Sequence, residues 1–397
     1  MTTKITNARI VGENELFIEL DVWFRDGRIL AVTRDERPFD ISADRVIDAG
    51  GAYLSPGWID IHTHGAGGAD FLDGTPDAYR TAARMHAEHG TTTLLPTTTS
   101  VDTARIVTSA AALDAARDDP DLPDMPGLHL EGPYLAVSQK GAQEDRFIHP
   151  FDEAETDAIL SASDRILRWT AAPELPGAER FAERLLSRGI LPSIGHTDAD
   201  FAEVERAYRM GFTHVTHLYS CMSTVHRVNA YRVAGVLEAA YCLDGMTAEL
   251  IADGCHLPPE LLRFAVKFKG RERLALVTDS MRAAGMPEGP SILGARENGL
   301  PVIVEEGVAK LVDRSAFAGS VATADRLVRT MVGAGISLVD AVYMITASPA
   351  RIMRFADRGT LSPGARADFT LFDDDIRVAM TVVGGRVVYE KREGTHA

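Results

Sequence analysis

The chain has 397 residues, of which 45% are hydrophobic and 25% are charged, and its formal net charge is -16. This is the composition of an ordinary globular protein with room for one large domain and a smaller one, and it excludes nucleic acid and anionic membrane surfaces as expected partners. Three cysteines, an odd and low number, argue against a disulfide framework and fit the reducing cytoplasm, where we expect the protein.

Both ends of the chain have a β pattern. Residues 1–55 contain alternating runs such as LFIELDVWFRDGRILAV, separated by Gly and Asp-Gly turns, and residues 360–397 contain GARADFTLFDDD and AMTVVGGRVVYE. The centre alternates strand and helix patterns instead. We therefore predict a small β-sandwich domain built from both chain ends, with a catalytic domain over 56–359 inserted between them.

The central segment contains eight apolar or β-branched runs, each followed by a turn and a helical pattern. The runs are WIDIHTH, TTTLLPTTT, GLHLEG, ILRWTAAPE, LPSIGHT, HVTHLYS, TAELIADG and LALVTDS. Eight such units predict a (β/α)8 TIM-like barrel of the α/β class. An open doubly wound sheet is the alternative, but no GxGxxG fingerprint opens the first unit. Residues 285–320 break the alternation, and we expect a β-hairpin insertion there.

Residues suited to binding metals and moving protons stand at the ends of these runs. They are His62, His64, Glu131, His196, His217 and Asp279. The carboxyl ends of the strands meet at one rim of a parallel barrel, and this rim carries the chemistry. Imidazole and carboxylate groups are ligands of zinc and of related divalent metals. The ordered set therefore predicts a metal-dependent hydrolase.

Spacing suggests how several of these residues act. His62 and His64 lie two apart on a strand, so both point to one face and can share a metal. The Gly-Pro pair after Glu131 ends the strand, and this carboxylate can bind one metal or bridge two. Asp279 can accept a proton from a water whose pKa a metal lowers to roughly 7, and pass it to a leaving amine. His256, after the seventh run, could polarise a carbonyl or bind a substrate oxygen.

The remaining histidines have weaker signals. His129 shares the strand face of Glu131, so we expect it to fill the barrel or to support the ligands. His214 alternates with His217 and is predicted to face the helices. Four more lack a position at the end of a strand and are assigned to the structural class: His86, His89, His149 and His396.

The motifs resemble those of the N-acetylglucosamine-6-phosphate deacetylases of the amidohydrolase superfamily, over nearly the whole chain. The matching segments are PGWIDIHTHG, HLEGPY, APE, IGHT, THLYSCMS, ADGCHL, VTDSMRAAG, FAGS, ASPARIM and GTLSPGARADFTLFD. The resemblance implies hydrolysis of the acetamide of N-acetyl-D-glucosamine 6-phosphate to D-glucosamine 6-phosphate and acetate.

The resemblance also implies how the metals are held. Glu131, His196 and His217 would bind the principal metal. His62 and His64 would bind a second metal, with Glu131 bridging the two. We expect two divalent metals per subunit, with zinc first and with iron, manganese or cobalt also compatible with nitrogen and carboxylate ligands.

Catalytic and substrate-binding roles follow from the same resemblance. Asp279 would be the general base and then the general acid, and His256 would contact the sugar or stabilise the oxyanion. The backbone amides of Ser220 and Cys221 would contact the substrate phosphate. These two residues stand where many relatives have Asn-Ala.

Two further substrate contacts are expected. Gln143 stands where many relatives have a histidine after KGA, and its amide would keep a neutral hydrogen-bonding role with the substrate. An arginine would help to bind the phosphate, and we favour Arg227 over Arg232. Members of the family often form dimers in which the neighbouring subunit helps to bind phosphate, so we expect a homodimer acting on a small amino sugar phosphate.

Other functions remain open at this point. The substrate could be the galacto epimer or an unphosphorylated sugar, and a different amidohydrolase could act on N-acyl amino acids or cyclic amides. Cyclic-amide members carry a carboxylated lysine after the fourth strand, whereas this chain has Ala-Pro-Glu174 there. A barrel that only binds sugar or a partner would be expected to lose ligands, and all six positions are intact.

Overall fold

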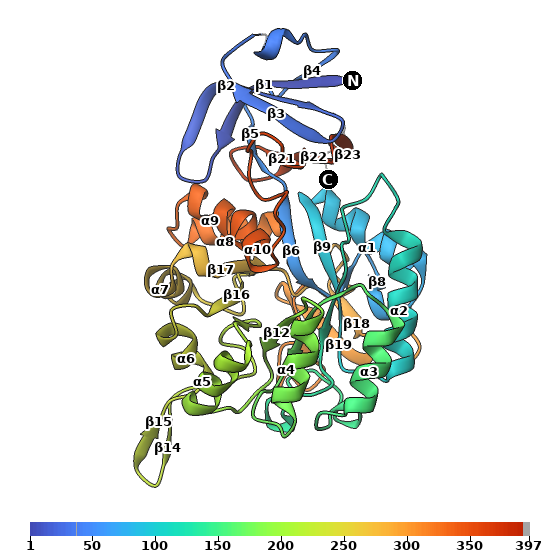
Figure 1. The fold of residues 1–397 in the computed structure, drawn as a ribbon, viewed down its shortest axis with the longest axis vertical. Helices are drawn as coiled ribbons and strands as arrows, with labels where there is room; N and C mark the ends of the chain where they lie inside the picture. The colour runs from blue at the N-terminus through green and yellow to red at the C-terminus, as the bar shows by residue number, and fades with distance from the viewer. Residues whose placement is uncertain (37, 392–397) are drawn as a thin grey trace.

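The computed structural model describes residues 1–36 and 38–391. The chain folds into a barrel with a separate sheet at one end, and the sheet contains strands from both ends of the chain (Figure 1). No helix in the described part of the chain has the length and apolar character needed to cross a bilayer.

Eight parallel strands form the barrel within the described residues, and they are the eight runs predicted from the sequence. In order around the barrel they are β6 (Trp58–Thr63), β9 (Thr91–Thr98), β10 (Leu128–Glu131), β11 (Ile166–Ala171), β12 (Leu191–Ile194), β13 (His214–Val215), β16 (Thr247–Ile251) and β17 (Leu274–Val277). The amide of Asp279, just after β17, donates to the carbonyl of His62 on β6 over 2.9 Å. This contact brings the first and last strands together, and the predicted fold class is confirmed.

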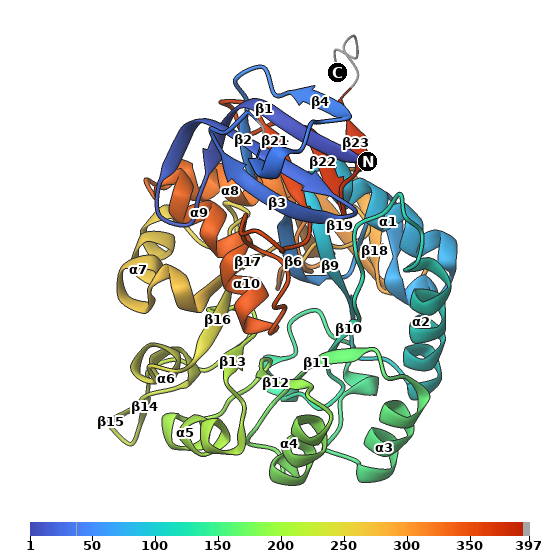
Figure 2. The same ribbon diagram turned by 45° about the horizontal axis from the view of Figure 1, so that its top comes forward.

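Helices surround the barrel and follow one another around its periphery (Figure 2). They are α1 (Pro76–Glu88), α2 (Thr103–Ala116), α3 (Glu153–Ala162), α4 (Ala178–Ser187), α5 (Phe201–Met210), α6 (Val236–Cys242), α7 (Pro259–Lys269), α8 (Ala324–Gly333), α9 (Leu338–Ile345) and α10 (Ala347–Ile352). Local sequence sets their ends. Asp200 and Glu203 form a capping box at the start of α5, and Gly211 ends it with a φ of 105°.

The sheet at the end of the barrel joins the two chain ends. Its order is β23–β22–β21–β5–β1–β2–β3, with β4 also pairing with β1. The strands are β1 (Thr2–Val11), β2 (Leu16–Arg25), β3 (Arg28–Thr33), β4 (Arg45–Asp48), β5 (Tyr53–Pro56), β21 (Phe369–Phe372), β22 (Val378–Val383) and β23 (Arg386–Glu390). Since β5 pairs with β1 on one side and β21 on the other, we keep 1–55 with 360–397, and 56–359, as the proposed domain division.

Antiparallel segments follow three of the barrel strands. After β17, the strands β18 (Gly289–Leu293), β19 (Leu300–Glu305) and β20 (Val308–Leu311) form a three-stranded sheet, one strand more than the predicted hairpin. After β13, the strands β14 (His226–Val228) and β15 (Tyr231–Val233) form a hairpin that projects from the barrel (Figure 1). A short pair, β7 (Gly65–Ala66) and β8 (Ala69–Asp70), follows β6.

Candidate metal centre and active site

The six residues predicted at the strand ends converge at one rim of the barrel. Their side chains are buried: His62, His64, Glu131, His196, His217 and Asp279. The first two lie at the end of β6 and Glu131 is the last residue of β10, whereas the other three follow their strands by two residues. Parallel strands in a closed barrel explain why residues up to 217 positions apart meet here, because all strand ends share one rim.

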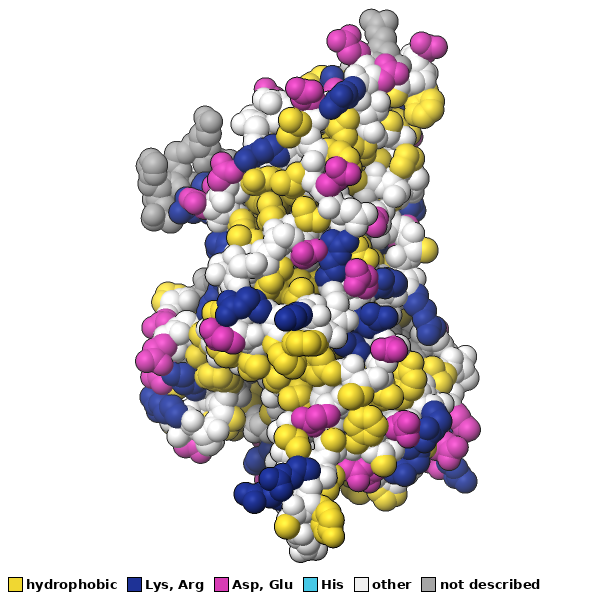
Figure 3. All heavy atoms as spheres, turned by 90° about the vertical axis from the view of Figure 1, so that its left-hand side faces the viewer, with side chains coloured by type: hydrophobic (Ala, Val, Ile, Leu, Met, Phe, Trp, Pro, Cys, Tyr) yellow, Lys and Arg dark blue, Asp and Glu magenta, His cyan; other side chains and the backbone are white. Residues whose placement is uncertain are grey.

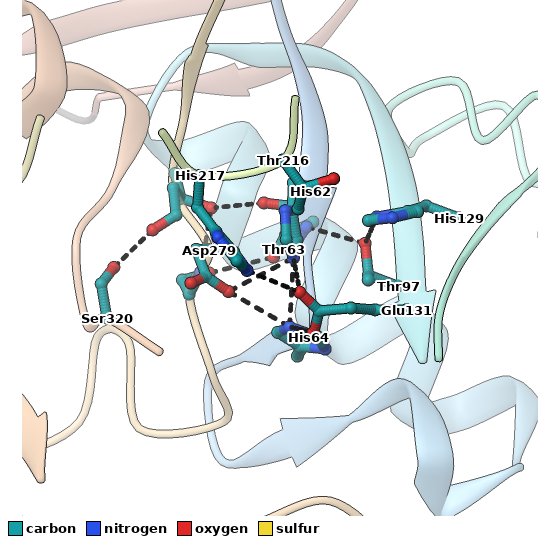
Figure 4. A network of polar contacts seen from close by, with 12 residues as sticks. His62, Thr63, His64, Thr97, His129, Glu131, Thr216, His217, Asp279 and Ser320 are labelled. Carbon is teal, nitrogen blue, oxygen red and sulfur yellow. Dashed lines mark hydrogen bonds and ion pairs between the residues drawn. The ribbon is translucent and has the colours of Figure 1, made fainter. Parts of the chain in front are cut away.

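The carboxylate of Glu131 is shared by two groups of possible metal ligands (Figure 4). Its Oε1 atom lies 2.9 Å from His217 Nε2 and 3.2 Å from His196 Nε2. Its Oε2 atom lies 3.5 Å from His64 Nε2, and His62 Nε2 is 3.7 Å from Oε1. In each group the candidate ligand atoms lie within 4.8 Å of one another. Glu131 is therefore placed to serve both groups.

Hydrogen bonds behind the imidazole rings show that this donor set suits a cation. The ring of His196 donates from Nδ1 to the carbonyl of Gln139 over 2.8 Å, and a carbonyl can only accept. This leaves Nε2 directed at Glu131 Oε1, where burial acts to lower the pKa of the ring but the carboxylate helps to raise it and favours a proton on Nε2. Similarly, His62 Nδ1 is 3.0 Å from a carboxylate oxygen of Glu249. The site needs positive charge between these nitrogens and the carboxylates, and a divalent metal would supply it in place of the protons, so these residues fit a divalent metal.

Both carboxylates of the centre are anionic at neutral pH. Burial alone would raise the pKa of Glu131, but His196 and His62 outweigh it and hold that pKa well below its usual range. Burial also acts to raise the pKa of Asp279, and the charges of His62 and His64 outweigh it and lower that pKa. Asp279 Oδ1 lies 3.1 Å from His64 Nε2. An ionised carboxylate at this distance from the ligand set is suited to accept a proton.

Three of the six residues have a left-handed backbone conformation that residues other than glycine rarely adopt. The φ angles of His196, His217 and Asp279 are 49°, 32° and 47°. Such a conformation costs about 1–3 kcal/mol and persists only where the surroundings enforce it. Here the amide of His217 donates to Glu249, and the carbonyl of Asp279 accepts from the amide of Ser320 over 2.7 Å. The left-handed conformation at these three positions directs the side chains toward a common point.

A buried ion pair below the rim was not predicted from the sequence. Arg168 and Glu249 are fully buried and form an ion pair inside the barrel. Glu249 Oε2 accepts from His62 Nδ1 and from the amide of His217, both at 3.0 Å. Burial would raise the pKa of Glu249, but Arg168 and His62 outweigh it and keep it well below its usual range. The signal for this pair was a charged residue in the middle of each of two apolar strand segments, ILRWTA and TAELI.

The prediction that His214 faces the helices is wrong. Its Nδ1 atom lies 2.7 Å from Thr247 Oγ1, and its Nε2 atom lies 3.6 Å from Glu249 Oε1, inside the barrel. Strand β13 ends at Val215, and the left-handed turn at His217 follows. Because alternation holds only within a strand, it could not relate His214 to His217.

The other histidines lie outside the ligand set. His129 is 2.7 Å from Thr170 Oγ1 and packs edge-on against the ring of His62, as an interior support. His86 is buried, and His89 and His149 contact the carboxylates of Asp325 and Glu155 respectively. His396 lies outside the described residues.

A cavity of about 210 Å³ opens above the ligand set. Its lining includes most of the predicted site residues: His64, Glu131, Gln143, His196, His217, Ser220, Cys221, His256 and Asp279. Sequence reasoning missed Thr99, Leu293 and Phe317, which also line it. Leu293 and Phe317 belong to the segment after β17, so this insertion forms one wall of the cavity.

His256 is held in place by Asp253. The ring Nδ1 of His256 lies 2.8 Å from Asp253 Oδ2, and Asp253 Oδ1 accepts the amides of Cys255 and His256, each at 2.8 Å. Phe317 packs against the other side of the ring with centroids 4.7 Å apart. The remaining ring nitrogen of His256 is therefore available to the cavity.

The expected phosphate contacts are only partly assembled within one chain. The amide of Ser220 donates to the carbonyl of His217 over 2.9 Å, while the amide of Cys221 has no acceptor among the described residues. Arg227 does not line the cavity of its own chain. It lies opposite Arg232 in the strand register of the exposed hairpin β14–β15. This hairpin points outward and carries basic side chains at the bottom of Figure 3.

Comparison with known proteins agrees with this geometry. The model of the amidohydrolase family matches residues 53–388. This chain belongs to the amidohydrolase family. The family is metal-dependent, and in this chain the groups that share Glu131 are the candidate metal sites.

Individual relatives are similar over their full lengths. The N-acetylglucosamine-6-phosphate deacetylase of Bacillus subtilis is 32% identical, with 98% of each chain covered. The N-acetylgalactosamine-6-phosphate deacetylase of Escherichia coli O157:H7 is 30% identical, with 98% of this chain and 99% of the relative covered. A solved structure of a variant N-acetyl-D-glucosamine-6-phosphate deacetylase from Mycobacterium smegmatis, in complex with N-acetyl-D-glucosamine 6-phosphate, matches with a TM-score of 0.87 and 30% identity, covering 98% of this chain and 99% of that one. These comparisons confirm the resemblance inferred from the motifs.

Proposed function

We propose that this protein hydrolyses the acetamide of N-acetyl-D-glucosamine 6-phosphate, giving D-glucosamine 6-phosphate and acetate. The observation that carries the proposal is the placement of Asp279, an ionised carboxylate 3.1 Å from His64, in a cavity whose floor is two His–Glu groups sharing Glu131. Full-length relatives with deacetylase names supply the substrate class.

In this proposal two divalent metals bind per chain. Glu131, His196 and His217 would hold the first metal, and His62, His64 and the shared Glu131 would hold the second. The ligands are nitrogen and oxygen atoms without thiolate, a set that suits zinc first and also iron, manganese or cobalt. When bound, the metals supply the positive charge that polarises a carbonyl and acidifies water.

The chain's own residues then move the proton. Asp279 accepts a proton from the attacking water, whose oxygen forms the new bond to the acetyl carbon. The same carboxyl group delivers this proton to the sugar nitrogen as the carbon–nitrogen bond breaks, so that acetate and the free amine leave. Well-placed proton transfer of this kind contributes about 10²- to 10⁴-fold to the rate.

His256 orients the substrate. With Nδ1–H donated to Asp253, an uncharged ring presents Nε2 as an acceptor and can hold a sugar hydroxyl. A second proton on the ring would make it a donor to the carbonyl oxygen as negative charge develops there, which is the oxyanion role. Asp253 supports either role because it fixes the ring against Phe317.

The phosphate site is proposed to be completed by a second copy of the chain. No lysine or arginine is among the described residues that line the cavity, whereas Arg227 stands on a hairpin that projects from the barrel. In a homodimer, Arg227 of one copy would reach the phosphate bound near the amide of Cys221 in the other. We place this reaction in the cytoplasm, consistent with three free cysteines.

The test is acetate release by the metal-loaded protein from three substrates: N-acetylglucosamine 6-phosphate, its galacto epimer and unphosphorylated N-acetylglucosamine. Turnover confined to the gluco phosphate is expected. The galacto phosphate is the second candidate, because a galacto-specific relative is 30% identical over its full length. Turnover of none of the three by metal-loaded protein would reject the sugar substrate and redirect attention to N-acyl amino acids and cyclic amides.

A further inference from the structure

Gln143, predicted to contact the substrate, uses both ends of its amide inside the protein. Its Oε1 atom accepts from the amide of Ser100 over 2.7 Å, and its Nε2 atom donates to Glu131 Oε2 over 2.8 Å. The residue is 6% exposed. Ser100 follows β9 and Glu131 ends β10, so the side chain of Gln143 ties together the ends of two neighbouring barrel strands.

This contact singles out one oxygen of the shared carboxylate. Glu131 Oε1 faces His196 and His217 and lies 3.7 Å from His62 Nε2, whereas Oε2 faces His64 and receives the hydrogen bond from Gln143. The terminal torsion of a glutamate is broad, so the carboxylate can otherwise turn about its own axis. A fixed donor at Oε2 limits that rotation and keeps Oε2 toward His64 and Oε1 toward His196 and His217.

We propose that Gln143 is a positioning residue that orients Glu131 between the two halves of the metal centre, a role distinct from the substrate contact predicted above. The inference rests on the proposed metal centre, but not on which acetamide is cleaved. The amide suits this role because it donates at one end and accepts at the other, and it stays uncharged beside Glu131 at every pH.

The two internal bonds use one N–H and one lone pair of the amide, so the positioning role does not require that a substrate contact be absent. Breaking the bond to Ser100 would leave a buried backbone amide without its partner. Breaking the bond to Glu131 would free the carboxylate. Supporting contacts of this kind typically change metal affinity by about 10- to 100-fold when removed.

The experiment compares Gln143→Leu with the wild-type holoenzyme. Leucine keeps much of the volume and removes both hydrogen bonds. Metal release to a chromophoric chelator gives the affinity of each metal, and steady-state kinetics at saturating metal give kcat and KM for N-acetylglucosamine 6-phosphate. We expect the more weakly held metal to be lost about tenfold more readily, and kcat to fall while KM stays within twofold. In a protein that binds one metal, the same weakening is expected of that metal.

Thr99→Val is the matched control, because Thr99 also lines the cavity but has no hydrogen bond to the ligand set in the described structure. Its metal affinities should equal those of the wild type. Unchanged metal affinities in Gln143→Leu, with KM raised tenfold or with no kinetic change, would overturn the proposal. Metal release needs no substrate, so a wild-type protein inactive on every acetamido sugar would reject the proposed reaction and still leave the role of Gln143 measurable.

Discussion

The two halves of the metal centre are built in different ways. His62 lies in strand β6 and His64 directly follows its last residue, and the ring of His62 is supported from below by the buried Glu249. His196 and His217 lie beyond their strands in left-handed conformations, and loop contacts hold His196: its carbonyl accepts from Ala136, and its ring donates to Gln139. Sheet geometry therefore orients the first half, whereas loops orient the second.

This difference has a physical consequence. A residue inside a strand inherits its direction from the whole barrel, so only a change that disturbs the core can move it. A residue in a strained turn keeps its direction only while its neighbours enforce it. Glu249 links the halves, because one oxygen accepts from the ring of His62 and from the amide of His217. Loss of this carboxylate should affect both halves, and a loop change should affect only the second.

The largest effect is expected from a substitution that removes the proton carrier and leaves both halves of the metal centre in place. Asp279→Asn keeps the shape of the side chain but cannot accept a proton, so kcat should fall by about 10²- to 10⁴-fold. Metal content, measured by atomic absorption on the purified protein, should stay at the wild-type level. Activity within threefold of wild type would show that another group carries the proton.

The next effect tests the support beneath the first half. Glu249→Gln places an amide NH₂ against the donors of either Arg168 or His62, since the carboxylate accepts on both sides. Breaking a buried ion pair in this way costs about 3–5 kcal/mol of unfolding free energy. Denaturant unfolding in excess chelator measures this loss without a contribution from metal.

A double variant tests whether the stability lost in Glu249→Gln comes from a buried charge left without its partner. Glu249→Leu combined with Arg168→Met removes both buried charges, and it should recover part of the stability lost in Glu249→Gln. Its metal affinity should remain low, because His62 and the amide of His217 still lack their acceptor. Full stability of Glu249→Gln itself would contradict the role assigned to the pair.

Metal removal tests the centre as a whole. A ligand that binds only the folded protein at 1,000 times its Kd stabilises it by about 4.1 kcal/mol. Stripping the metal with a chelator should therefore lower the thermal unfolding midpoint by several degrees, and adding zinc back should restore it. A thermal unfolding midpoint that changes neither with the chelator nor with added zinc would indicate that the ligand set holds no metal in solution.

The smallest effect is expected from the loop that holds His196. Ser138 donates to Asp198, and Gln139 donates to the same carboxylate over 2.5 Å, on the exposed side of the loop. Ser138→Ala should cost about 0.5–1.5 kcal/mol at most and weaken one metal only several-fold. Metal release from the holoenzyme measures this, with Ser187→Ala at the exposed end of α4 as control. Equal weakening of both metals would contradict the distinction between the two halves of the metal centre.

Much of this arrangement was predictable from the sequence because it follows from local pattern. The eight runs, the helical patterns that follow them and the ligands at the ends of the runs predict a parallel barrel and one reactive rim. His62 and His64 were assigned to one face on their spacing alone. The predicted strands are those observed, and the family assignment rests on the same motifs.

What the sequence could not decide depends on contacts between distant strands and on backbone torsions beyond strand ends. The pairing of Arg168 with Glu249 joins residues 81 apart across the barrel interior. His214 was misplaced because a two-residue strand carries no lasting alternation, and the bonds of Gln143 to Ser100 and Glu131 join residues far apart in the chain. Only the folded barrel sets these neighbours, and packing holds His196, His217 and Asp279 in a left-handed conformation that residues other than glycine adopt uncommonly.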